Sequence, residues 1–164
     1  MKVEEIQRHR KEWKKLIEKG NPKYVVMISF RNDINCKKSN SVIRKLLCKM
    51  RNDYFGKNKN KRFLDGFVVM EYQQNGKPHY HIVFNDNEIY QRQDRNFNDV
   101  VYKKCNSMKV IGMDEHLSIQ DYYKSNLEEY LTKTVEQRDF IEIVDPECRR
   151  DNFDFISPIT YSGF

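Results

Sequence analysis

The sequence predicts one α+β domain, with an antiparallel sheet flanked by helices. Two observations favour this class: a β-hairpin signal near the middle of the chain, and two segments whose apolar residues recur at helical spacing. No internal repeat, low-complexity tract or linker divides the 164 residues, and a chain of this length fits one domain. We therefore expect residues 1–164 to form a single domain that begins with an amphipathic helix.

The first third of the chain alternates between helix and strand signals. Residues 2–19 place apolar side chains at helical spacing among Lys, Arg and Glu, and Gly20-Asn21-Pro22 ends that helix. The β-branched and aromatic run 23–30 predicts a strand. Residues 41–54 carry the apolar stripe of a helix packed on a sheet, and a basic, turn-rich loop follows over 52–62.

A hairpin is predicted next, from strands 63–72 and 78–85. The residues between them contain Asn75-Gly76, the strongest short hairpin signal. Residues 86–117 are harder to interpret: they are polar at first, and a strand is expected over 108–113.

The last predicted elements are a helix and a strand. Ser118-Ile119-Gln120-Asp121 matches a capping box, which predicts a helix from Ser118 to about Gln137. The apolar run 139–144 then predicts a strand.

Composition excludes several classes of protein. Aromatic residues make up 13% of the chain, which argues against disorder. No apolar run approaches the roughly 20 residues of a membrane-spanning helix, and the N-terminus has no apolar signal-peptide core. The four cysteines form no CxxC pair or zinc-like spacing, so we expect reduced thiols in a cytoplasmic compartment.

Charge is distributed unevenly along the chain. Residues 1–62 contain 19 Lys and Arg against 6 Asp and Glu, whereas residues 63–164 contain 11 against 18. This asymmetry indicates a surface that faces a polyanion, and nucleic acid is a candidate partner. A solvated lysine-rich surface kept for solubility explains the same charge equally well.

The first candidate site is a pair of histidines on the second hairpin strand. His79 and His81 are two residues apart, so both imidazoles point to the same face of the sheet. Glu71 lies on the opposite strand. With Asn75-Gly76 as a two-residue turn, Glu71 pairs with Tyr80 and its side chain lies on the other face from the histidines. A longer loop or a bulge reverses that parity, and the three side chains then make a site for a divalent cation.

The second candidate site is Tyr130-Leu131-Thr132-Lys133. On a helix, Tyr130 and Lys133 are neighbours on one face. A tyrosine hydroxyl has a pKa near 10 and is a poor nucleophile at neutral pH, but an ammonium group and a metal ion near the target phosphate both assist it. Ordinary packing of an amphipathic helix is the alternative explanation.

Together the two motifs resemble the HUH endonuclease superfamily, in particular rolling-circle replication initiators. His79-Tyr80-His81 matches its metal motif, Glu71 and Gly76-Lys77-Pro78 match features of viral members, and Tyr130 with Lys133 matches its nucleophile motif. The strand that ends in Ser29-Phe30 is a loose match to the first motif of the family. The resemblance spans roughly residues 23–145.

The resemblance implies a five-stranded antiparallel sheet and a nicking-and-joining mechanism on single-stranded DNA at a replication origin. It implies that Glu71, His79 and His81 bind Mn²⁺ or Mg²⁺ and that Tyr130 attacks the scissile phosphate to form a 5′-phosphotyrosine link. Lys133 offsets negative charge in this scheme. A helicase or other replication proteins are the implied partners, and a plasmid or virus is the implied source.

Origin recognition is expected from the basic half of the chain. Tyr54 and Phe55 are candidates to stack on bases, and Tyr123 is expected to pack rather than react. The residues expected to contact phosphates are Lys37, Lys38, Arg44, Lys45, Lys57, Lys59, Lys61 and Arg62.

Two other functions fit the same motifs. A single-strand transposase or a relaxase uses the same chemistry, although relaxases usually place the tyrosine before the histidines. A non-catalytic DNA-binding domain of the same fold is the third hypothesis, and the intact set of Glu71, His79, His81 and Tyr130 argues against it.

Overall fold

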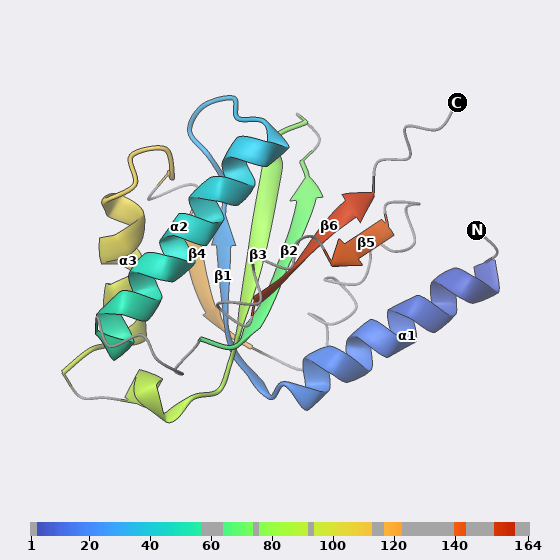
Figure 1. Ribbon diagram of the computed structural model, residues 1–164, viewed down its shortest axis with the longest axis horizontal. Helices are drawn as coiled ribbons and strands as arrows, with labels where there is room; N and C mark the ends of the chain where they lie inside the picture. The colour runs from blue at the N-terminus through green and yellow to red at the C-terminus, as the bar shows by residue number, and fades with distance from the viewer. Residues whose placement is uncertain are drawn as a thin grey trace.

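The computed structural model describes residues 3–56, 64–73, 76–91, 94–112, 117–122, 140–143 and 153–159 (Figure 1). Within them lie three α-helices, a short 3-10 helix and six strands. In chain order these are α1 (Val3–Lys19), β1 (Pro22–Ile28), α2 (Cys36–Phe55), β2 (Gly66–Tyr72), β3 (Pro78–Asn85), η1 (Glu88–Gln91), α3 (Phe97–Asn106), β4 (Leu117–Asp121), β5 (Phe140–Ile143) and β6 (Phe153–Ile159).

The strands form one sheet in the order β4-β1-β3-β2-β6-β5. The first four strands of that order pair antiparallel, and β5 pairs antiparallel with β6. The β2–β6 pair is parallel, so β6 joins the hairpin from a distant part of the sequence. The predicted α+β class with an antiparallel sheet is confirmed. Its contiguous antiparallel part has four strands, one fewer than the resemblance implies.

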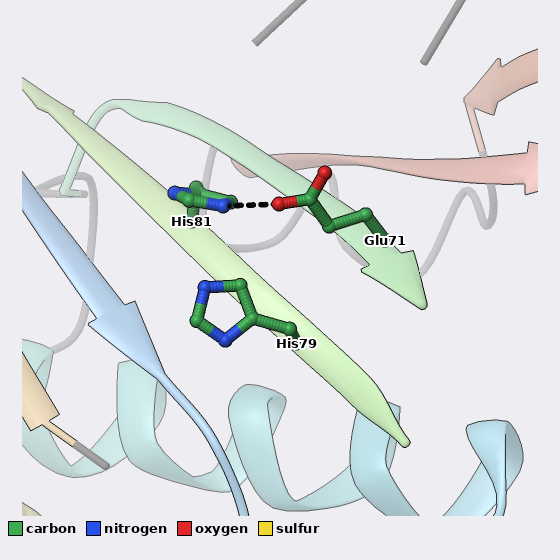
Figure 2. A group of neighbouring side chains, drawn as sticks. All are labelled: Glu71, His79 and His81. Carbon is green, nitrogen blue, oxygen red and sulfur yellow. Dashed lines mark hydrogen bonds and ion pairs between the residues drawn. The ribbon is translucent and has the colours of Figure 1, made fainter. Parts of the chain in front are cut away.

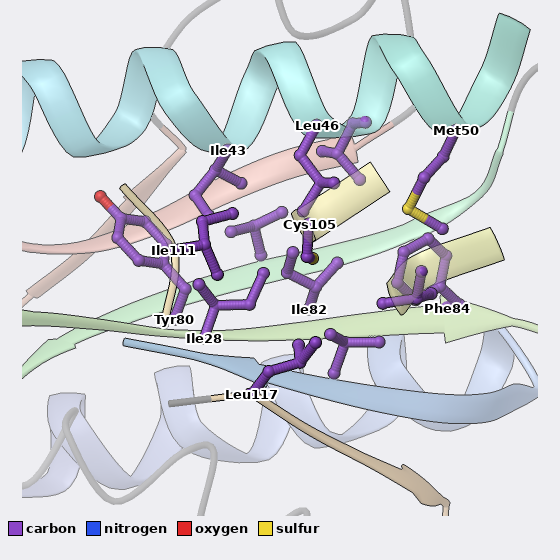
Figure 3. Packing of buried hydrophobic residues seen from close by; sticks show 14 of the residues in the cluster. Ile28, Ile43, Leu46, Met50, Tyr80, Ile82, Phe84, Cys105, Ile111 and Leu117 are labelled. Carbon is purple, nitrogen blue, oxygen red and sulfur yellow. The ribbon is translucent and has the colours of Figure 1, made fainter. Parts of the chain in front are cut away.

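Helix α2 covers one face of the sheet with the apolar stripe that the sequence predicts (Figure 3). Ile43 and Leu46 are fully buried, and they pack in the same cluster as Tyr80, Ile82 and Phe84 of β3. Because side chains alternate along a strand, these three residues of β3 share one face. Helix α3 contributes Phe97, Val100, Val101 and Cys105 to the same cluster.

The opposite face of the sheet holds a much smaller apolar cluster. Val25 of β1, Val69 of β2 and Val83 of β3 pack there around Ile17 of α1. Figure 3 shows α1 on the far side of the sheet from α2. The predicted amphipathic helix therefore closes the second layer of the fold, and it leaves polar residues of the same strands further along this face.

The helix predicted to start at Ser118 is wrong at its first turn. Leu117–Asp121 is strand β4, which pairs antiparallel with β1. Leu117 and Ile119 alternate with polar residues, and both pack against the cluster under α2. Pairing with the open edge of β1 therefore outweighs the local capping signal, which is a weak determinant beside tertiary contacts.

Two further expectations differ from the structure between Asp86 and Leu117. Residues 108–113 form no strand in their described part, where Ile111 makes a single bridge to Phe30. Helix α3 precedes them. Its N-cap is Asn96, whose side chain accepts a hydrogen bond from Asn98 N at 2.9 Å. Spacings of three, four and eight residues from Phe97 predict this helix, but the polar residues around it mask the pattern.

The boundaries of other elements agree with expectation, with one extension. Helix α2 begins at Cys36 rather than near Ser41, because Asn35 caps it by accepting a hydrogen bond from Lys38 N at 2.8 Å. Strand β5 confirms the strand expected over 139–144, and β6 was not expected. Among the described residues, no helix is long and apolar enough to cross a membrane.

Candidate metal centre

The register of the β2–β3 hairpin places Glu71 opposite His79. Gly76 N donates to Gln73 O at 2.8 Å, Gln73 N donates to Lys77 O at 2.9 Å, and Gly76 has a φ of 75°. A three-residue connection with a left-handed glycine produces this arrangement. The register that follows from a two-residue Asn75-Gly76 turn, with Glu71 opposite Tyr80, is therefore wrong.

The one-residue difference brings three candidate ligands to one face of the sheet (Figure 2). Glu71, His79 and His81 each offer a ligand atom, and these atoms lie within 4.8 Å of one another. The two imidazole rings have centroids 4.7 Å apart and are nearly perpendicular, at 80°. Neighbouring positions on β2 and β3 hold all three side chains, so the sheet itself fixes their spacing.

His81 and Glu71 contact each other directly. His81 Nε2 lies 2.7 Å from Glu71 Oε1, and the imidazole is only 1% exposed. A carboxylate only accepts hydrogen bonds, so the ring nitrogen donates in this contact. His81 also pairs with Met27 of β1 and Val69 of β2. Those neighbours surround the imidazole with backbone and apolar groups that hold its position.

His79 is held from the other side, by β1. Its Nδ1 lies 2.8 Å from Ser29 Oγ. Burial is the main reason that the pKa of His79 falls to about 4; the His81 imidazole adds to the lowering and the Glu71 carboxylate opposes it. At neutral pH the imidazole is therefore uncharged and has a lone pair available for a cation.

The donor set suits a divalent cation. Two imidazole nitrogens and one carboxylate oxygen on one side of a sheet leave coordination positions for water or substrate. Mn²⁺ and Zn²⁺ accept this mixed set readily, whereas Mg²⁺ prefers oxygen ligands. The residues present therefore fit a metal ion, and Glu71, His79 and His81 are the groups that would hold it.

Tyr80, between the two histidines, fastens the metal strand to α2. Its hydroxyl lies 2.7 Å from Ser39 Oγ and donates a short hydrogen bond to Asn40 Oδ1. Both partners lie in the N-terminal part of α2. The alternation of β3 thus uses one residue for packing between two residues for ligation.

The predicted phosphate contacts that the structure describes lie on α2. Lys37, Lys38 and Lys45 are exposed, and Arg44 is half-buried. Because α2 covers the face of the sheet opposite the three ligands, these cations do not surround the metal centre (Figures 1 and 2). Tyr54, a candidate for base stacking, is 3% exposed and packs on Tyr90 with ring centroids 5.4 Å apart, so its stacking role is wrong.

Several predicted site residues lie outside the described residues. They are the nucleophile candidate Tyr130 with Lys133, the packing candidate Tyr123, and the basic loop residues Lys57, Lys59, Lys61 and Arg62. Their roles stay predictions.

The fold and the site define an α+β domain whose hairpin presents a candidate two-histidine, one-carboxylate centre on an antiparallel sheet. The family model of the replication-associated proteins of the ORF2 type matches residues 23–139, and the chain belongs to this family. The matched region contains the whole hairpin and the Tyr130–Lys133 motif. No curated protein and no solved structure matches the chain significantly.

Proposed function

We propose that this replication-associated protein is a metal-dependent nicking and joining endonuclease that initiates rolling-circle replication on single-stranded DNA. The observation that carries the proposal is the cluster of Glu71, His79 and His81 on one face of the hairpin. Membership in the replication-associated family supports the biological setting, and the His-x-His and Tyr-x-x-Lys motifs support the chemistry.

The three ligands would bind Mn²⁺ or Mg²⁺. When bound, the cation would polarise a phosphodiester oxygen and offset the negative charge that develops on the phosphoryl group. The residues around the centre favour this use: neutral His79 and buried His81 supply lone pairs, and the carboxylate of Glu71 partly balances the charge of the ion.

Tyr130 is the proposed nucleophile. Its phenolic oxygen would attack phosphorus in line, forming an O–P bond to the tyrosine as the bond from phosphorus to the 3′ oxygen breaks. The phenolic proton leaves to solvent or a base, and the released 3′ oxygen takes up a proton to become a hydroxyl. Lys133, one helical turn along, would stabilise the phenolate or the phosphate. The reverse attack by a 3′-hydroxyl rejoins the strand.

A covalent adduct is the direct test. We would incubate the full chain and Mn²⁺ with a pool of single-stranded oligonucleotides that carry a fluorophore at either the 5′ or the 3′ end. A 5′-phosphotyrosine link retains the downstream fragment, so the protein band on a denaturing gel should carry the 3′ label and not the 5′ label. EDTA and the Tyr130→Phe variant should each abolish the labelled band.

Two matched controls identify the nucleophile. Tyr102→Phe removes an exposed hydroxyl on α3 and should leave adduct formation unchanged. Tyr123→Phe should also retain it, because Tyr123 is expected to pack. An adduct that survives Tyr130→Phe would assign the attack to another residue. Absence of an adduct in the wild-type protein, with Mn²⁺ or Mg²⁺ and with the origin DNA of its replicon, would overturn the proposal.

A further inference from the structure

Ser29 occupies a special place at the end of β1. It follows Ile28, which pairs with Tyr80, and thus lies beside the strand position of His79. Its side chain is 7% exposed, one of the few buried polar side chains among the described residues. The Ser29 hydroxyl oxygen lies 2.8 Å from His79 Nδ1, across 50 residues of sequence.

Gln73 restrains the same hydroxyl from the hairpin side. Gln73 Nε2 donates to Ser29 Oγ at 3.4 Å, at the base of the connection between β2 and β3. An amide NH₂ group only donates, so this contact uses Ser29 Oγ as an acceptor. Lys77 of the same connection forms an ion pair with Asp33 at 3.0 Å, which ties the hairpin to the segment after β1 a second time.

The hydrogen bond to Ser29 bears on which nitrogen of His79 is available. A neutral imidazole carries one proton and has one free lone pair. If His79 Nδ1 carries the proton, it donates to Ser29 and leaves the lone pair on Nε2. Figure 2 shows one ring nitrogen of His79 turned toward His81, and the other, Nδ1, is the one that contacts Ser29.

We propose that Ser29 is a positioning residue for the metal centre: its hydroxyl accepts a hydrogen bond from His79 Nδ1 and so orients the ring and presents Nε2 to the cation. Gln73 holds the hydroxyl in place for that role. Histidines that bind metals commonly use their second ring nitrogen in this way, and loss of the outer partner costs about 10–100-fold in metal affinity. The inference rests on the proposed metal-binding function.

Mn²⁺ affinity of the full chain, measured by calorimetry in the absence of DNA, is the first readout. Ser29→Ala should weaken binding by about 10–100-fold. Ser29→Thr keeps a hydroxyl at the same position and should restore most of the affinity. Ser118→Ala is the matched control, because Ser118 lies on the adjacent strand β4 and contacts Gln120 rather than the centre. Its affinity should equal that of the wild type.

The tautomer of His79 is a second readout that a merely structural role would not move. Long-range ¹H–¹⁵N correlation spectra of the metal-free protein distinguish protonated from unprotonated ring nitrogens. The wild type should carry the His79 proton on Nδ1, and Ser29→Ala should lose that preference while the rest of the spectrum keeps its dispersion. Circular dichroism of each variant checks that the fold is retained.

The outcomes separate the inference from the function beneath it. Wild-type protein that binds Mn²⁺ together with an unchanged affinity in Ser29→Ala would overturn the role of Ser29 alone. So would a wild-type His79 protonated on Nε2. Wild-type protein that binds no Mn²⁺ would overturn the proposed metal centre, and the positioning role with it.

Discussion

The two faces of the sheet differ in what the same strands bury. Among the described residues, 22 buried side chains form the cluster toward α2 and α3, whereas four form the cluster toward α1. Strand β3 shows the contrast most clearly: Tyr80, Ile82 and Phe84 pack under α2, and His79 and His81 lie on the other face. Stability and candidate chemistry are therefore assigned to opposite sides of one strand.

This division has a physical advantage for a metal centre. A close-packed apolar face keeps the backbone of β3 in place, and that backbone fixes the imidazole positions on the other face. The ligands can then hold a cation without also supplying the packing that keeps the domain folded. If this is correct, changes on each face should have separable effects.

The largest effect on stability is expected from the α2 face. Leu46→Ala removes a fully buried side chain and should lower the free energy of unfolding by about 2–5 kcal/mol, measured by urea denaturation. Ser41→Ala, an exposed change on the same helix, should stay within about 0.5 kcal/mol of wild type. Mn²⁺ affinity of folded Leu46→Ala should match the wild type. A parallel loss of affinity would show that the two faces are coupled.

The next effect is on affinity, from the opposite face. Glu71→Gln keeps the shape of the side chain but removes its charge, and should weaken Mn²⁺ binding by about 100-fold or more, which is about 2.7 kcal/mol. Unfolding of the metal-free variant should change by less than about 1 kcal/mol, because Glu71 lies outside the packed clusters. Glu88→Gln, on the exposed surface of η1, is the control with unchanged affinity.

The smallest effect is a pH dependence that belongs to the α2 face. Burial raises the pKa of the Cys105 thiol to about 12, against an ordinary value of 9.0. The unfolded chain therefore releases this proton near pH 9 while the folded protein keeps it, so stability falls as pH rises above 9 and the loss is complete only near pH 12. Unfolding at pH 9, 10 and 11 in reductant should show Cys105→Ala losing about 1 kcal/mol less per pH unit than wild type.

A second variant separates titration from packing at this position. Val100→Ala also removes buried apolar surface from α3 but introduces no change in ionisable groups. It should be less stable at every pH and keep the wild-type slope above pH 9. Equal slopes in wild type and Cys105→Ala would contradict the buried-thiol explanation.

Much of the fold follows from local pattern, and its exceptions have specific causes. The stripe in α2 and the alternation in β3 are strong periodic signals, so both elements were predictable. Strand β4 was not, because its five residues gain their stability from pairing with β1, which a capping motif cannot reveal. Helix α3 had a signal in the spacing from Phe97 and in its cap at Asn96.

The candidate site was only partly predictable for a similar reason. Two residues apart on a strand, His79 and His81 had to share a face, whichever register the hairpin took. The face of Glu71 depended on the length of the connection, which the residues Asn75-Gly76 alone did not fix. Ser29 carried no local signal at all, because its contact with His79 depends on the packing of β1 beside β3.

The hairpin connection has a consequence for how this chain can vary. Because side chains alternate with a period of two, deleting one residue between Tyr72 and Pro78 would move the Glu71 carboxylate to the opposite side of the sheet from both imidazoles. All three ligands would still be present in the sequence, yet they would no longer meet. Insertions and deletions of two residues preserve the geometry where those of one do not, so loop length, counted as odd or even, encodes the site as surely as its side chains.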